Sequence, residues 1–455
     1  MAGIGFELRK LLRKDTYLGI LQAYGYAGLI SSGPWVLSIL GVTMVGVVCI
    51  SSQGSKDDLP IFWSSITYVI AGSLILTGFL QLLFTRFVAD RIYEDREHVI
   101  VPNLIGALAL TSIIAVLCGA PVVTWIPGSW VYKALMLSSF VATCEVWIVV
   151  VFVTGLKAYR SILTIFLGSY SGMVLVAYTL RHQGVEGLLT GFLTGHALLF
   201  LLLFSLVLYY YPARRAISFE FLSFKKSFYS LAFTGFVYNL GLWIDKLLFW
   251  SHPITSAEVL GPLRASALYD LPIFLAYLSV IPGMAVFIFR IETDFAENYE
   301  RFYDGVRGGG TLQEIEELRN GMVFAVRQAI YEIFKVQGLT VAVLIAFGPP
   351  VLASFGVSPV HTRIFCVDVL GVGGLVLLLA LLNVFFYLDY RGIALALATA
   401  FAIANAAATI VTIELGPSFY GFGFAVASIA IGLAGIVWLD RKLERLEYET
   451  FMLQR

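Results

Sequence analysis

Long apolar segments recur along the whole chain, and short polar stretches separate them. A helix needs about 20 apolar residues to cross the hydrocarbon core of a bilayer, so the pattern predicts about twelve transmembrane helices. The expected spans are 20–50, 61–85, 104–126, 132–153, 161–180, 187–211, 228–250, 265–289, 328–347, 364–388, 392–412 and 419–439. The fold class that follows is an all-α polytopic membrane protein.

The two ends of the chain and its middle divide it into parts. Residues 1–18 place apolar side chains from Ile4 to Leu12 at helical spacing and basic side chains on the other face, which predicts an amphipathic helix on the membrane surface. Half of the spans precede residues 212–227 and half follow, so we expect two six-helix lobes around a central cavity. The parts are the helix 1–18, the lobes 19–211 and 228–439, the linker 212–227 and the tail 440–455.

Charge sets the orientation of these spans. With both termini on one side, most of the 30 lysine and arginine residues fall on that side. Cytoplasmic loops carry an excess of such residues. We therefore expect both termini, the linker and the loop 291–327 to be cytoplasmic.

The loop 291–327 is the longest and holds many acidic residues. Gly308, Gly309 and Gly310 break it in two, and Thr311 with Glu314 forms the capping-box pattern that starts a helix. Two interpretations remain open: a solvated hairpin, or a landing site for a cytoplasmic enzyme.

The seventh expected span carries ionisable residues. An ionised side chain at the centre of a membrane costs at least about 2.5–3.5 kcal/mol, so Asp245 and Lys246 must face other helices or a watery cavity. Asn239 lies two helical turns before Lys246, and Tyr238 lies two turns before Asp245. The residues therefore line a transport path or form a buried structural ion pair.

Other spans add polar positions. Ser73, Thr77, Gln81 and Thr85 form a stripe that suits packing or a cavity equally well. Proline at position 34 kinks the first span next to Trp35. Glu332 and Lys335, near the start of the ninth span, are expected to pair with each other. The predicted pathway residues are Glu145, Tyr238, Asn239, Asp245, Lys246, Asp270, Tyr277, Trp35 and Gln81.

The deep charges bear on the cargo. Glu145, Asp245 and Asp270 outnumber Lys246, whereas a lipid diphosphate would need several embedded cations. A neutral or amino-sugar cargo fits better, because aromatic faces such as Trp35, Tyr238, Trp243 and Tyr277 suit sugar rings. This balance speaks against a lipid-linked oligosaccharide flippase.

Several function classes lack support. Formal net charge is zero, which gives no general attraction to nucleic acid. The four cysteines show no CxxC or Cys/His spacing, so neither a metal nor a disulfide framework is expected. No GxSxG or phosphate-binding glycine loop occurs, and loop 291–327 is too short for a nucleotide-sugar domain. We expect no enzyme activity and no cofactor.

The opening MAGIGFELRKLL and the later ISSGPWVLSI resemble the PelG family of Pel-polysaccharide exporters. The resemblance implies an inner-membrane transporter of the multidrug/oligosaccharidyl-lipid/polysaccharide superfamily, with the first and seventh spans lining the cavity. It also implies export of an amino-sugar exopolysaccharide for the biofilm matrix. The implied partners are a cytoplasmic glycosyltransferase, companion inner-membrane subunits including a cyclic di-GMP receptor, and membrane lipids.

The sequence thus predicts a bacterial inner-membrane polysaccharide exporter. Three alternatives remain: a lipid-linked oligosaccharide flippase, a non-transporting scaffold for the polysaccharide synthase, and an antiporter for small cations or drugs, which embedded acids also suit.

Overall fold

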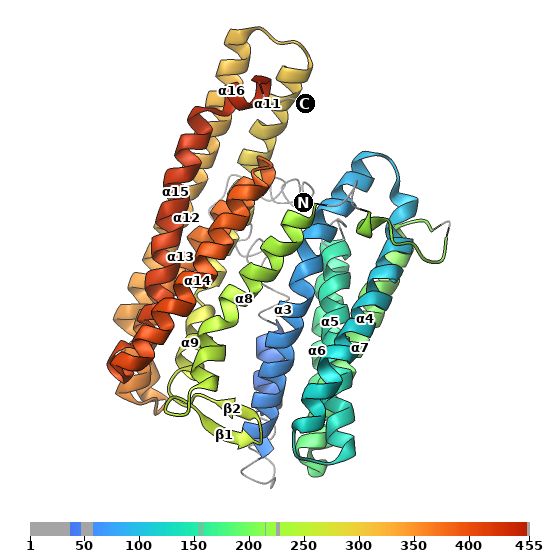
Figure 1. The fold of residues 1–455 in the computed structure, drawn as a ribbon, viewed down its shortest axis with the longest axis vertical. Helices are drawn as coiled ribbons and strands as arrows, with labels where there is room; N and C mark the ends of the chain where they lie inside the picture. Colours follow the sequence, from blue (N-terminus) through green and yellow to red (C-terminus); the bar gives the residue numbers. More distant parts are fainter. Residues whose placement is uncertain are drawn as a thin grey trace. The chain divides into compact units, whose positions relative to one another are not determined.

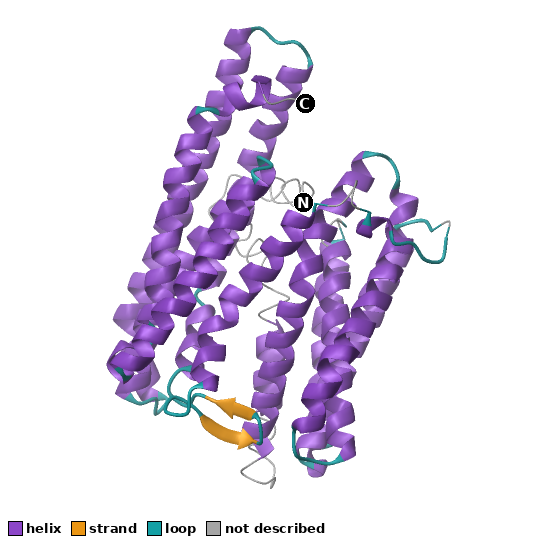
Figure 2. Cartoon of the chain, viewed as in Figure 1, coloured by secondary structure: helices purple, strands orange, loops and turns teal. Residues whose placement is uncertain are grey.

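The computed structural model describes most of the chain as helices (Figures 1 and 2). The described residues are 37–46, 58–153, 156, 158–213, 215–223 and 228–452. They fall into two compact units, which we name the N-terminal unit, within Pro34–Ala267, and the C-terminal unit, within Leu268–Arg455. The N-terminal unit includes the seventh expected span, whereas the sequence analysis predicts the boundary between the two lobes at residues 212–227. That lobe boundary stays a prediction.

The N-terminal unit is a helix bundle with one short hairpin of strands. Its elements are α3 (Asp58–Tyr93), η1 (Glu97–Val99), α4 (Ile100–Trp125), α5 (Trp130–Val153), α6 (Tyr159–Thr179), η2 (Arg181–Gln183), α7 (Val185–Tyr210), η3 (Glu220–Leu222), α8 (Tyr229–Ser251), β1 (Ala257–Leu260) and β2 (Leu263–Ala265). Helix α3 packs against α5 and α8, and α7 packs against α5 and α6. Helix α3 therefore joins α8 to the rest of the unit.

Two glycines let α3 and α8 cross at close range. A Cβ atom added at Gly235 would lie 2.3 Å from the carbonyl oxygen of Gly78, and one added at Gly78 would lie 2.8 Å from the carbonyl oxygen of Gly235. Small residues at helix crossings allow backbones to approach closely inside membranes. The pair therefore fixes which parts of α3 and α8 face each other.

The strands β1 and β2 form an antiparallel hairpin after α8. Its turn contains Gly261 with φ of +56°, a backbone conformation that glycine adopts without strain. The Tyr68 hydroxyl donates to the backbone carbonyl of Arg264 at 3.1 Å, and the Arg264 side chain donates to Ser256. The hairpin is thus attached to α3.

The C-terminal unit is also a helix bundle. Its elements are α9 (Asp270–Tyr277), α10 (Val280–Arg290), a π-helical segment η4 (Ile291–Phe295), α11 (Ala296–Arg307), α12 (Leu312–Ser354), α13 (Pro359–Tyr387), α14 (Arg391–Leu415), η5 (Pro417–Phe419), α15 (Phe422–Glu444) and α16 (Leu446–Met452). Helix α13 lies among α9, α12 and α15, and α14 packs on α15. The central place of α13 agrees with its many buried apolar residues.

The eighth expected span is broken into α9 and α10. Helix α9 packs on α13, whereas α10 packs mainly on α12. At the break, the Gln337 amide on α12 donates to the carbonyl of Ser279 at 3.1 Å. A Cβ at Gly283 would lie 2.5 Å from the Gln337 side-chain oxygen, so α10 sits close against α12.

Helices α11 and α12 form a hairpin that continues beyond the bundle (Figure 1). Thr311 accepts from the backbone of Glu314 and Glu314 accepts in return, so the expected capping box is present. At about 1.5 Å per residue, the 43 residues of α12 extend about 65 Å, well over the thickness of a bilayer. Arg319 pairs with Glu447 of α16 at 3.2 Å, which braces the hairpin against the C-terminal helix.

Among the described residues, 10 helices are long and apolar enough to cross a membrane. The first expected span is described only from Leu37 to Gly46, as a shorter apolar helix. The seventh expected span corresponds to α8, which holds the charged residues and is not one of these 10 helices. The kink at Pro34 and the surface helix 1–18 lie outside the described residues.

Candidate functional site

Polar side chains line the crossing of α3 and α8 in the N-terminal unit. The Asn239 amide donates to the carbonyl of Gly235 at 2.9 Å and to the side-chain oxygen of Gln81 at 3.4 Å. Gln81 in turn donates to the Thr77 hydroxyl at 3.0 Å. Two predicted pathway residues from distant parts of the sequence, Gln81 and Asn239, are therefore in contact.

The same stripe of α3 also bonds to α5. The Thr77 hydroxyl donates to the carbonyl of Ser73 at 2.7 Å, and the Trp147 ring nitrogen donates to the Ser73 hydroxyl at 3.1 Å. These bonds give the stripe a packing role between helices. A further role in lining a path stays a prediction.

Replacing Ser73 with alanine should lower the stability of the N-terminal unit, because the Trp147 ring nitrogen loses its acceptor. Hydrogen bonds between helices in membranes contribute about 0.6 kcal/mol on average and at most about 1.7. Thermal unfolding in detergent measures the loss. Thr164→Ala is the matched control, since this exposed hydroxyl bonds only to its own helix. Equal effects of the two variants would contradict the packing role.

The charged residues of α8 form an ion pair. The Lys246 ammonium lies 3.0 and 3.1 Å from the two carboxylate oxygens of Asp245 and donates to the carbonyl of Leu242 at 2.9 Å. Asp245 is 0% exposed and Lys246 is 5% exposed. Each charge is thus compensated within α8, which meets the requirement for ionised groups at membrane depth.

Aromatic rings continue this face of α8 toward the strand hairpin. The Lys246 ammonium lies 5.8 Å from the Trp243 ring centre, and Trp243 lies 6.2 Å from Trp250. Trp250 stacks on Tyr68 of α3 at 4.7 Å between ring centres. We name Tyr68, Trp243 and Trp250 the aromatic row. The sequence analysis considered Trp243 but missed Tyr68 and Trp250, whose alignment depends on the packing of α3 and α8.

Four other predicted residues lie on α5, α8 and α9. Glu145, on α5, accepts a hydrogen bond from Ser112 of α4 at 2.6 Å. Tyr238 is half-buried on α8. Asp270 and Tyr277 belong to α9 of the C-terminal unit, where the Tyr277 ring lies 6.0 Å from the Phe424 ring. Trp35 lies outside the described residues.

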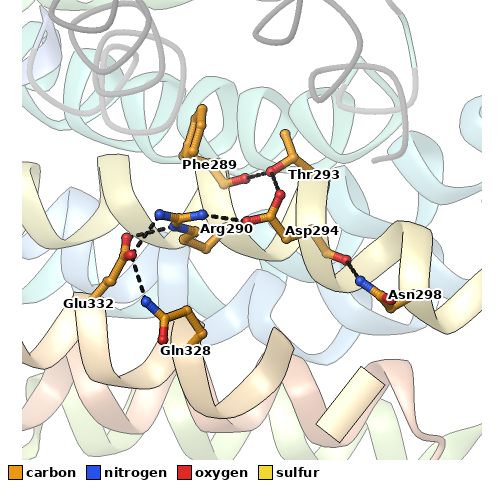
Figure 3. A network of polar contacts seen from close by, with 7 residues as sticks. All are labelled: Phe289, Arg290, Thr293, Asp294, Asn298, Gln328 and Glu332. Carbon is orange, nitrogen blue, oxygen red and sulfur yellow. Dashed lines mark hydrogen bonds and ion pairs between the residues drawn. The ribbon is translucent and has the colours of Figure 1, made fainter. Parts of the chain in front are cut away.

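The C-terminal unit has a polar network of its own around Arg290 (Figure 3). The Arg290 guanidinium donates two hydrogen bonds of 2.6 Å to the Glu332 carboxylate and a further one to Asp294. Gln328 donates to Glu332 at 3.0 Å. Asp294 lies in the π-helical segment η4, and such segments often mark functional positions.

This network corrects one expectation. Lys335 was expected to pair with Glu332, but the Glu332 carboxylate pairs with Arg290 of α10, and Lys335 is exposed. A guanidinium offers two parallel donors to one carboxylate, which an ammonium on the same helix does not. The pairing therefore joins α10 to α12 instead of stabilising α12 alone.

Asp368 is a buried acid that the sequence analysis missed. It lies in α13 and is 0% exposed. A Cβ atom added at Gly421 would lie 2.6 Å from a carboxylate oxygen of Asp368, so this acid abuts the start of α15. An acid inside the otherwise apolar span 364–388 was the available signal.

Within the part of the chain that the structure describes, no group of three histidine, cysteine, aspartate or glutamate side chains is placed to hold a metal ion. The polar groups above are instead hydrogen-bonding, charged and aromatic side chains.

Comparison with known families decides the identity of the chain. The model of the family "PelG: Putative exopolysaccharide Exporter (EPS-E)" matches residues 1–451. The chain belongs to the PelG family. A PelG-family chain is a transporter and not an enzyme. The predicted resemblance to this family and the prediction that the chain is not an enzyme are both confirmed. No curated protein matches the chain.

Solved structures show the same fold at low sequence identity. A transporter of the MOP superfamily from Pyrococcus furiosus is 14% identical, with a TM-score of 0.63 over 93% of this chain and 96% of that one. A MATE transporter in the bent conformation is 14% identical, with a TM-score of 0.65 over 93% and 94%. The Vibrio cholerae MATE transporter VcmN is 13% identical, with a TM-score of 0.60 over 97% and 98%. The prediction of an all-helical, two-lobed, multi-pass membrane protein is confirmed.

Proposed function

We propose that this PelG-family chain moves a Pel-type amino-sugar polysaccharide from the cytoplasm to the periplasm for the biofilm matrix. Membership of an exopolysaccharide exporter family is the observation that carries the proposal. The proposed location is the bacterial inner membrane, with both termini cytoplasmic. This orientation rests on the distribution of lysine and arginine.

The proposed contact surface for the polymer in the N-terminal unit is the polar and aromatic face of α8, whose Asn239 and Lys246 are 7% and 5% exposed and must become accessible when polymer binds. Asn239, Trp243 and Lys246 recur at helical spacing and so lie on one side of α8. They offer amide, aromatic and cationic groups, which suit the hydroxyls, acetamides and apolar ring faces of an amino sugar. Asp245 compensates the charge of Lys246, so the surface suits a neutral polymer.

The proposed polymer-contacting residues also include Asp270 and Tyr277 in the C-terminal unit. In the N-terminal unit they include Glu145 and Tyr238. Gln81 is included through its contact with Asn239. Trp35 is retained from the sequence pattern alone. The chemistry of this set supports a sugar cargo over a lipid diphosphate, because Lys246 is its one cation.

The proposed partners are a cytoplasmic glycosyltransferase and companion inner-membrane subunits that include a cyclic di-GMP receptor. The hairpin of α11 and α12 supports a docking role for loop 291–327, since it is capped, braced by α16 and longer than a membrane span requires. Its exposed residues include Glu300, Glu316 and Glu317. A basic partner surface would complement them.

The decisive experiment uses cells that lack this chain but express the partner synthase with labelled nucleotide sugar. We expect labelled polymer to accumulate in the cytoplasm or on the inner face of the membrane, and to appear outside when the chain is restored. Absence of polymer everywhere would instead favour a scaffold on which synthesis depends. Accumulation of a lipid-linked oligosaccharide would favour the flippase.

A further inference from the structure

The part of the 212–227 linker that the structure describes is seated in the N-terminal unit. We name residues 215–223 the linker strap. Phe221 is 0% exposed, and its ring centre lies 4.7 Å from that of Phe84, which lies 5.1 Å from that of Phe152. A buried phenylalanine in an aromatic cluster holds the strap against α3 and α5.

Backbone contacts fix the strap further. The Ser218 amide donates to the carbonyl of Pro102 at 2.9 Å, and the Phe221 amide donates to the Asn103 side chain at 3.3 Å. A Cβ atom added at Gly106 would lie 2.2 Å from the carbonyl oxygen of Ser218, so the strap touches the backbone of α4. Glu220 pairs with Arg96 at 3.5 Å. The strap is therefore a built part of this unit.

Two observations favour a position of the strap at the depth of the lipid headgroups. Gly106 lies about 29 Å along α4 from Trp125, at roughly 1.5 Å per residue, which equals the thickness of the hydrocarbon core. Tyr209 and Tyr210, at the end of α7, are 83% and 47% exposed. Exposed tyrosines at a helix end mark the interface between membrane and water. The strap begins at Arg215, five residues after Tyr210.

The outward side of the strap is apolar and basic. Ile217, Phe219 and Leu222 are 46%, 47% and 44% exposed, although Phe221 between them is buried. Arg215 is exposed beside them. The one acid of the strap, Glu220, is paired with Arg96.

We propose that the linker strap is a binding surface for anionic phospholipid on the cytoplasmic leaflet. Ile217, Phe219 and Leu222 enter the headgroup region, and Arg215 binds the lipid phosphate. Apolar anchors combined with basic residues bind anionic membrane surfaces, and each basic residue near such a membrane contributes about 1 kcal/mol. The proposal goes beyond polysaccharide transport and does not depend on the cargo.

The site has a consequence for α8. The Tyr229 hydroxyl donates to the carbonyl of Leu222 at 2.8 Å, and the Arg86 guanidinium lies 5.4 Å from the Phe228 ring centre. The strap therefore contacts the start of the helix that carries Asp245 and Lys246. Anionic lipid bound at the strap stabilises α8 against α3.

The test compares the full chain with two strap variants. One is Arg215→Gln, and the other combines Ile217→Ser, Phe219→Ser and Leu222→Ser. All four side chains are exposed, so the fold should survive their replacement. The chain is reconstituted in vesicles of phosphatidylcholine alone, or of equal parts phosphatidylcholine and phosphatidylglycerol. Thermal unfolding is measured in both, and bound phosphatidylglycerol is counted by native mass spectrometry.

We expect phosphatidylglycerol to raise the midpoint of unfolding of the native chain and to raise it less in both variants. The apparent affinity for phosphatidylglycerol should fall about fivefold for Arg215→Gln, as expected for loss of one basic residue at the surface. Arg301→Gln and Ile254→Ser are controls, because these residues are exposed elsewhere in the chain. Equal lipid dependence in the native chain and both variants would overturn the proposal. It would also be overturned if both variants bound lipid as the native chain does but no longer copurified with a protein that the native chain retains.

Discussion

Replacing Asp245 with asparagine, or Lys246 with methionine, is expected to lower both stability and polysaccharide export. Each variant leaves one buried charge without its ion-pair partner, and losing one member of a buried pair costs about 3–5 kcal/mol. The pair is almost fully buried and joined by two contacts near 3 Å. Protein yield in the membrane, thermal unfolding and exported polymer are measured together.

The double variant Asp245→Asn with Lys246→Met separates structure from function. A neutral pair leaves no uncompensated charge, so we expect stability to recover toward that of the native chain. Export should stay low, because the polymer-binding groups are still missing. Full recovery of export along with stability would show that the pair is structural and would remove it from the proposed path.

The polar face of α8 was predictable from the sequence because it follows from helical spacing within one segment. The residues of α3 that contact this face were not predictable from it. Gln81 meets Asn239, and Tyr68 meets Trp250, only because Gly78 and Gly235 set the crossing of α3 and α8. Nothing in the local sequence of α8 specifies which face of α3 it will meet.

The network around Arg290 shows why the predicted pair of Glu332 and Lys335 was wrong. Glu332 and Lys335 have favourable spacing on one helix, and such local pairs contribute only about 0.2–0.5 kcal/mol. Arg290 approaches Glu332 from a different helix and donates two hydrogen bonds to it. A long-range bidentate contact outweighs a local one, and no spacing rule within α12 reveals it.

Burial explains why Asp368 escaped attention. The sequence analysis did not consider Asp368, whose neighbours at helical spacing within its own span are mainly apolar. Its surroundings include Gly421 at the start of α15, which is separated from it in the sequence by the rest of α13, α14 and η5. The packing of α13 on α15 creates this environment.

Replacing Arg290 with glutamine is the second change for which we expect a large effect. The Arg290 contacts join α10 and η4 to α12, and a hydrogen bond to a charged group contributes about 1.5–3 kcal/mol. The partial exposure of these side chains places the loss in the lower part of that range. Thermal unfolding measures the total loss, and hydrogen exchange of the α11–α12 backbone measures where the structure loosens.

A double-mutant cycle with Glu332→Gln tests the contact itself. If Arg290 and Glu332 act as a pair, the double variant should lose less stability than the sum of the two single variants. Arg301→Gln is the matched control, since Arg301 forms an exposed pair with Glu297 on one helix and should cost only about 0.3–0.5 kcal/mol. Additive losses, or equal losses for Arg290→Gln and Arg301→Gln, would mean that α10 is held to α12 by the Gln337 contact and apolar packing alone. A coupled loss with faster exchange in α11 would mean that the Arg290 network transmits the position of the hairpin to the broken membrane helix.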